Sequence, residues 1–190
     1  MIETRQTVPV DAPIEAAWEY VKTIPNWASL MPGLQSCELL SEDDSRWVLK
    51  VGVGALVRTV KVDVHVDQWD GPERVFFTFK LQGDPVIGRG SYHAVSTSDT
   101  ASEMTLALQV EGTGPMAPMW EAMGGPLLPK FALAFGRQLA EGIEHASGDA
   151  QRAQQARPQQ PVRQAQPSLI ARLLAPLQKL WRRLSAGGAG

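Results

Sequence analysis

Apolar and polar residues alternate through much of the first two thirds of the chain, the pattern of half-buried β-strands. The clearest run spans residues 60–67, where four valines occupy every second position and charged or imidazole side chains occupy the others. Similar runs bounded by turn residues predict further strands over residues 2–10, 34–41, 46–53, 75–81, 87–97 and 103–112. The pattern therefore predicts about seven short antiparallel strands.

The apolar spacing changes to the 3.6-residue period of a helix in three segments. Residues 14–21 follow a proline that suits a first helical turn, and residues 26–31 form a shorter segment that stops at Pro32-Gly33. A long amphipathic helix is predicted near residues 127–145. This order of elements predicts an α+β fold, in which one curved antiparallel sheet wraps around a long C-terminal helix.

The last part of the chain has a different pattern. Residues 147–167 consist mainly of Gln, Ala, Arg and Pro, so we predict a flexible linker there. Residues 168–185 are predicted to form a basic amphipathic helix. Its apolar face would comprise Leu169, Ile170, Leu173, Leu174, Leu177, Leu180, Trp181 and Leu184. Its basic side chains are Arg172, Lys179, Arg182 and Arg183.

Such a helix is typical of a membrane interface, with Trp at the headgroups and basic residues facing anionic lipid. It is too short to cross a bilayer, because 16 residues span about 24 Å against a hydrocarbon core of about 30 Å. The alternative is a helix that packs on its own domain or on another copy. Charge is compatible with both, because residues 147–190 carry a formal charge of +6 and residues 1–146 carry −8.

Charge and cysteine content narrow the functional classes further. An acidic body lacks the basic footprint of a nucleic-acid-binding domain, so no nucleic-acid partner is predicted. The single cysteine, Cys37, excludes an intramolecular disulfide and suggests either a reducing compartment or indifference to redox conditions. The first residues lack the apolar core of a secretory signal. We therefore expect a cytoplasmic protein, peripheral on the inner face of the cell membrane.

No catalytic or metal-ligating set stands out. The three histidines, His65, His93 and His145, have no neighbour at ligand spacing, so no metal is expected. Cys37 is predicted to be a structural thiol. The glycine pairs at residues 52–54 and 88–90 lack the context of a dinucleotide site, and we interpret them as sheet bends or bulges. No nucleophile and base are paired.

The chain resembles the START-like helix-grip superfamily (SRPBCC) over about residues 1–146. Within that superfamily it is most similar to the CoxG family, which is associated with carbon monoxide dehydrogenase. The segments that carry the resemblance are Val10-Asp11-Ala12-Pro13-Ile14-Glu15-Ala16-Ala17-Trp18, Ile24-Pro25-Asn26-Trp27, Met31-Pro32-Gly33, Gly112-Thr113-Gly114-Pro115 and Gly124-Gly125-Pro126.

The resemblance implies an internal apolar cavity that holds a hydrophobic small molecule, either lipid-like or quinone-like, with no tightly bound cofactor. It also implies a non-enzymatic role in membrane recruitment, maturation or quinone delivery, with a carbon monoxide dehydrogenase-type molybdenum hydroxylase as the partner. The alternatives are a polyketide cyclase-like enzyme and an adaptor with an empty pocket. Candidate lining residues are Trp27, Leu30, Met31, Phe77, Phe79, Met104, Leu108, Met116, Met119, Trp120, Met123, Leu128, Phe131 and Phe135.

Overall fold

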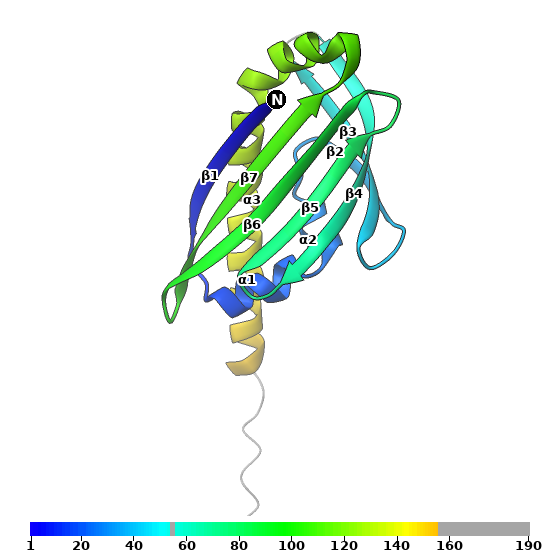
Figure 1. Ribbon diagram of the computed structural model, residues 1–190. Helices are drawn as coiled ribbons and strands as arrows, with labels where there is room; N and C mark the ends of the chain where they lie inside the picture. Colours follow the sequence, from blue (N-terminus) through cyan, green and yellow to red (C-terminus); the bar gives the residue numbers. More distant parts are fainter. Residues whose placement is uncertain (54–55, 156–190) are drawn as a thin grey trace, which may run out of the picture. The chain divides into compact units, whose positions relative to one another are not determined.

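A seven-stranded antiparallel sheet curves around one long helix (Figure 1). This computed structural model describes residues 1–53 and 56–155, and nearly all of them belong to one compact unit, Met1–Arg152. The strands are β1 (Ile2–Val10), β2 (Leu34–Leu39), β3 (Asp44–Val53), β4 (Leu56–Asp70), β5 (Arg74–Leu81), β6 (Val86–Ser98) and β7 (Ala101–Gly112). The predicted α+β helix-grip fold is therefore confirmed.

Consecutive strands from β2 to β7 are antiparallel neighbours, and β1 pairs with β7 to complete the order β1-β7-β6-β5-β4-β3-β2. The valines at positions 60, 62, 64 and 66 of β4 are all buried, as their alternation predicts. Register shifts interrupt the β2–β3, β4–β5 and β6–β7 ladders. Such bulges bend strands and increase their twist, which helps the sheet to curve.

Two short helices connect β1 to β2. Helix α1 (Ile14–Val21) buries Ile14, Ala17 and Val21. Helix α2 (Ile24–Ala28) begins two residues before the predicted segment and ends three residues earlier. Pro25 lies in its first turn, where proline's missing N–H costs no helical hydrogen bond, so this residue starts a helix there.

Helix α3 (Ala117–Gln155) follows a short 3₁₀ turn, η1 (Gly114–Met116), and extends beyond the predicted segment at both ends. Its first half contains Pro126 and Pro129. The glycines and prolines of residues 112–129 are the reason that the sequence pattern placed the beginning of the helix near residue 127. Residues 147–155 are helical, so the flexible linker predicted from residue 147 is wrong over that stretch. Ala, Gln and Arg are strong helix formers and can extend an existing helix without tertiary contacts.

The remainder of the predicted linker, residues 156–167, and the predicted amphipathic helix, residues 168–185, lie outside the described residues. Within the described ranges, no helix is long and apolar enough to cross a membrane.

The core is densest where the second half of α3 lies against the concave face of the sheet. Leu139 and Ile143 are 2% and 0% exposed. A Cβ added to Gly136 would lie 3.1 Å from Val8 of β1 and 3.4 Å from Leu106 of β7, so the helix closely approaches both strands here. This packing holds α3 in place and leaves its first half over the other end of the sheet.

Candidate functional site

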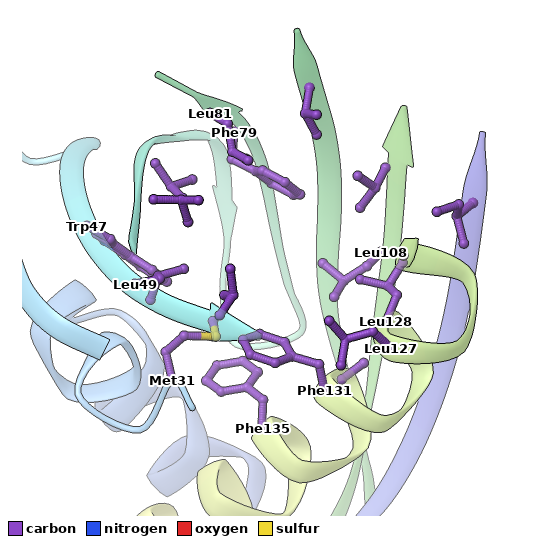
Figure 2. Close-up of a pocket in the computed structure, with 18 of the residues that line it drawn as sticks. Met31, Trp47, Leu49, Phe79, Leu81, Leu108, Leu127, Leu128, Phe131 and Phe135 are labelled. Carbon is purple, nitrogen blue, oxygen red and sulfur yellow. The ribbon is translucent and has the colours of Figure 1, made fainter. Parts of the chain in front are cut away.

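An apolar cavity of about 940 Å³ lies between the concave face of the sheet and the first half of α3. Its walls come from β1, from β3 to β7, from α1 and α2, and from α3. Figure 2 shows labelled side chains from strands and from α3, among them Leu49, Phe79, Leu108 and Phe131, directed toward this space. A cavity of this size matches the pockets that hold lipid- or drug-sized molecules.

Most of the lining residues predicted from the sequence are brought together here. Nine of them line the cavity: Trp27, Met31, Phe77, Phe79, Leu108, Trp120, Leu128, Phe131 and Phe135. Two lie elsewhere, because Met104 is 1% exposed in the packed core and Leu30 lies beside Gly142 in the second half of α3. Met116, Met119 and Met123 fall in η1 and α3, but their side chains lie outside the described part of the structure.

The sequence interpretation missed a large part of the strand wall. These residues are mainly aliphatic and include Leu49, Val60, Val62, Val64, Val86 and Leu106, together with Trp47. Their alternation marked them as inward-facing. Inward valines that fill a core and inward valines that border a cavity have the same pattern, so the sequence could not separate the two.

Two glycines on β6 make space for aromatic side chains in the wall. A Cβ on Gly88 would lie 2.2 Å from the ring of Phe79, and one on Gly90 would lie 2.3 Å from the ring of Phe77. Both glycines keep regular pairing with β5 and β7. Residues 88–90 therefore form no bulge, and the missing side chains let the two phenyl rings lie against the β6 backbone.

An aromatic cluster joins α2 to the sheet. The Trp27 ring lies 5.1 Å from the Trp47 ring and 6.0 Å from the Phe77 ring, measured between centroids. The indole N–H of Trp47 donates to the Ser45 hydroxyl at 2.9 Å. Such contacts add to area burial and fix the ring positions, so they give the cavity a rigid wall.

Polar groups are sparse in this wall. The described lining residues include the polar side chains of Tyr92, Ser91, Arg58 and Lys130 and the indoles, with no carboxylate or imidazole. Burial raises the pKa of the Tyr92 phenol, so this hydroxyl stays protonated. The carboxylates and imidazoles that most often act as general bases are therefore missing from the described lining, and Lys130 and Tyr92 are its titratable groups apart from Arg58.

The cavity opens to solvent near the start of α3. Val57 and Arg58 line it and are each more than half exposed. The Arg58 guanidinium forms an ion pair with Asp84 at 2.8 Å and lies 5.8 Å from the centre of the Trp120 ring. Arg58, Asp84 and Trp120, which we call the rim cluster, connect β4, the β5–β6 turn and the first turns of α3 across the opening.

The other candidate chemical groups lie outside the cavity. His65 contacts Asp44 at 2.9 Å on the exposed side of the β3–β4 pair. Burial raises the pKa of the Cys37 thiol, which disfavours the nucleophilic thiolate. Among the residues that the structure describes, no group of three or more His, Cys, Asp or Glu side chains could hold a metal ion.

A family model described as polyketide cyclase / dehydrase and lipid transport matches residues 1–144, which form the sheet, the short helices and most of α3. The chain belongs to this family. A search of curated proteins gives no significant match. Family membership confirms the START-like assignment, and the narrower resemblance to the CoxG family stays a prediction.

Solved structures with this fold include a START superfamily protein and an enzyme. A conserved protein from Geobacillus kaustophilus has a TM-score of 0.67 and 18% identity, covering 76% of this chain and 97% of its own. A START superfamily protein from Mycobacterium smegmatis has a TM-score of 0.55 and 16% identity, covering 78% and 98%. Norcoclaurine synthase from Thalictrum flavum, solved with a transition-state analogue, has a TM-score of 0.58 and 14% identity, covering 78% and 95%. At these identities the likeness shows the fold alone.

Proposed function

We propose that this family member binds a hydrophobic small molecule, lipid-like or quinone-like, and carries it without changing it chemically. The cavity supports this proposal most directly, because its wall is almost entirely apolar and its volume of about 940 Å³ can enclose a long ligand. Apolar surface buried on binding contributes about 25 cal/mol per Å², so such a wall supplies affinity without specific polar contacts.

We further propose that the protein works on the inner face of the cell membrane and serves a carbon monoxide dehydrogenase-type molybdenum hydroxylase. The resemblance to CoxG proteins supports the partner. The basic amphipathic pattern of residues 168–185 supports the membrane. Four basic side chains near anionic lipid contribute about 4 kcal/mol, to which the apolar face adds, so attachment would be reversible.

A second candidate function is a cyclase-like reaction inside the cavity. Family membership favours this alternative, as does the shared fold with an enzyme, norcoclaurine synthase. Such a reaction needs an acid or base placed against the substrate. The described lining includes the Tyr92 hydroxyl and the Lys130 amine as possible acid–base groups, but no Asp, Glu or His.

The ligand can be identified by mass spectrometry of a solvent extract of the full-length protein purified from its native membrane fraction. We expect one class of apolar molecule at near-stoichiometric amount. The matched control is Leu108→Trp, which places a larger side chain in the cavity and should abolish co-purification while the far-UV spectrum stays unchanged. Equal amounts of the same molecule in both samples would contradict binding in the cavity.

Membrane attachment can be measured by flotation with vesicles of phosphatidylcholine containing phosphatidylglycerol. The double variant Leu173→Asp, Leu177→Asp disrupts the predicted apolar face and should remain in the soluble fraction. Leu39→Asp, which changes an exposed apolar residue of the folded domain, is the control and should float like the wild type. If the double variant floats too, the predicted helix does not mediate attachment.

A further inference from the structure

Two buried hydrogen-bond donors in the cavity wall have no partner. Across the described residues, the buried side-chain polar atoms without a hydrogen bond are Trp27 Nε1 and Tyr92 Oη. Both residues line the cavity, and they are 6% and 3% exposed. Buried polar groups are normally paired, because losing water without gaining a partner costs free energy. Two such exceptions in the same cavity wall therefore require an explanation.

Other buried polar groups, both in the cavity wall and in the packed core, are satisfied. The indole N–H of Trp47, whose ring touches Trp27, donates to Ser45 at 2.9 Å. The buried Ser102 hydroxyl donates to the carbonyl oxygen of Ala12 at 2.9 Å. The two donors without a partner therefore both belong to side chains that line the cavity.

The two donors lie in neighbouring parts of the wall. Phe77 of β5 connects them: its ring is 6.0 Å from that of Trp27, and its backbone pairs with Gly90 of β6. Tyr92 is the next inward-facing position after Gly90 and pairs with Val75. One end of a bound molecule could therefore meet both donors.

We propose that Trp27 Nε1–H and Tyr92 Oη–H form the polar subsite of the cavity and donate hydrogen bonds to a carbonyl oxygen of an otherwise apolar ligand. This inference rests on the proposed ligand-binding function and adds the chemical class that the cavity selects. The indole N–H can only donate, so the matching group on the ligand must accept. The charged lining residues, Arg58 and Lys130, come from other positions in the wall, so a neutral oxygen suits this subsite better than a carboxylate.

The protonation state of Tyr92 agrees with this role. Burial raises the pKa of its phenol, so the hydroxyl remains a donor throughout the physiological range. Both donor atoms are covered by neighbouring atoms of the protein. Binding therefore includes a small side-chain rearrangement that exposes them to the ligand oxygen.

A matched pair of probes tests the subsite. The first is 2-methyl-1,4-naphthoquinone with one prenyl group at position 3, and the second is the same ring and chain without the two oxygens. Their affinities for the full-length protein are measured by isothermal titration calorimetry. We expect the wild type to prefer the quinone, and Tyr92→Phe, which removes one hydroxyl and keeps the ring, to lose about fivefold to tenfold in quinone affinity alone.

Trp27→Phe should reduce the preference for the quinone by a similar factor. Because this substitution also replaces the indole with a smaller ring, the ratio of the two affinities is the readout. Tyr20→Phe is the control, since Tyr20 donates to the Asn26 carbonyl oxygen and does not line the cavity. It should leave the ratio unchanged.

In the infrared, the carbonyl stretch of the bound quinone should lie at lower frequency in the wild type than in Tyr92→Phe.

Thermal unfolding separates this role from a structural one. Without ligand, Tyr92→Phe should unfold at the same temperature as the wild type or higher, because it removes an unpaired buried hydroxyl. Equal binding of both probes by the wild type, or equal losses for both probes in Tyr92→Phe, would overturn the subsite while leaving hydrophobic binding intact. If neither probe binds the wild type, the subsite and the proposed quinone-like ligand class both fail.

Discussion

The two halves of α3 face the same sheet but perform different tasks. In the second half, Ala140 and Ile143 are buried against strands and short helices. In the first half, Leu127, Leu128 and Phe131 are only partly buried and border a cavity of about 940 Å³. Figure 1 shows the single helix running from one end of the sheet, where α1 and α2 lie, to the other.

The difference shows where stability and binding come from in this fold. Close packing recovers both the hydrophobic transfer energy and the dispersion contacts of a side chain. A side chain beside empty space lacks contacts on one side, so it contributes less to the folded state and more to a ligand that fills the space. We expect substitutions in the second half to change stability and those in the first half to change binding.

The largest effect is expected from Ile143→Ala. This side chain is 0% exposed, and truncating a buried Ile typically lowers the free energy of unfolding by about 2–5 kcal/mol. Phe131→Ala is the comparison in the first half. It should lower the free energy of unfolding by less than Ile143→Ala, although it removes more atoms, because the Phe131 ring already borders the cavity. Urea denaturation of both variants measures the difference. Equal losses would show that the two halves are packed alike.

The next effect concerns the shape of the cavity. Gly90→Val would place a Cβ 2.3 Å from the Phe77 ring and 2.7 Å from Leu108 Cδ2, so these side chains must move into the cavity. We expect at least tenfold weaker binding of a hydrophobic probe and a loss of about 1–3 kcal/mol in stability. Gly125→Ala is the matched control, because a Cβ there meets nothing within 4 Å. Unchanged probe affinity in Gly90→Val would contradict the role assigned to this glycine.

A smaller effect is expected at the rim cluster. Arg58→Met removes the cation that lies over Trp120 and pairs with Asp84, an exposed contact worth about 0.5–1 kcal/mol. If this cluster restrains the start of α3 over the opening, ligand dissociation should accelerate about threefold with little change in stability. Stopped-flow displacement of a fluorescent fatty acid measures the rate. Arg74→Met, the control, changes an exposed arginine outside the cavity and should leave the dissociation rate unaltered.

The smallest effect is a pH dependence on the outer face of the sheet, away from both halves of α3. Hydrogen bonds from Gln82, followed by the Arg46 guanidinium at 2.8 Å, hold the pKa of Asp63 below its ordinary value. The carboxylate therefore stabilises the fold above about pH 4, and this stabilisation is lost as pH falls through the lowered pKa.

Asp63→Asn should accordingly lower the free energy of unfolding by roughly 0.5–1 kcal/mol at pH 7. The difference from the wild type should shrink below pH 4 as Asp63 itself becomes protonated. Denaturation at pH 7 and at successively lower pH gives both values. If the difference in unfolding free energy between the two proteins grew toward low pH, the assigned direction of the Asp63 pKa shift would be wrong. If Asp63→Asn changed the affinity for the hydrophobic probe at pH 7, the outer face of the sheet would be coupled to the cavity.

Local patterns predicted the strands well because each strand has one buried and one exposed face, and alternation records that directly. The valines of β4 are the clearest example. The boundaries of α3 were predicted less well. Prolines at 126 and 129 suggested a later start, and the polar composition after residue 146 suggested a linker where the helix in fact continues to Gln155. Both errors arise because a helix held by packing in its middle can extend through segments with weak local signals.

By itself, the sequence determined the order of elements, the α+β class and the supply of large apolar side chains on the inner face. Only the tertiary structure decided which of those side chains pack and which border empty space. Met104 and Phe79 illustrate this, because both follow the same alternation but one is buried in the core and the other lines the cavity. The physical reason is that a cavity is a property of volume enclosed by several strands and a helix. Periodicity along one strand records only the face to which a side chain points.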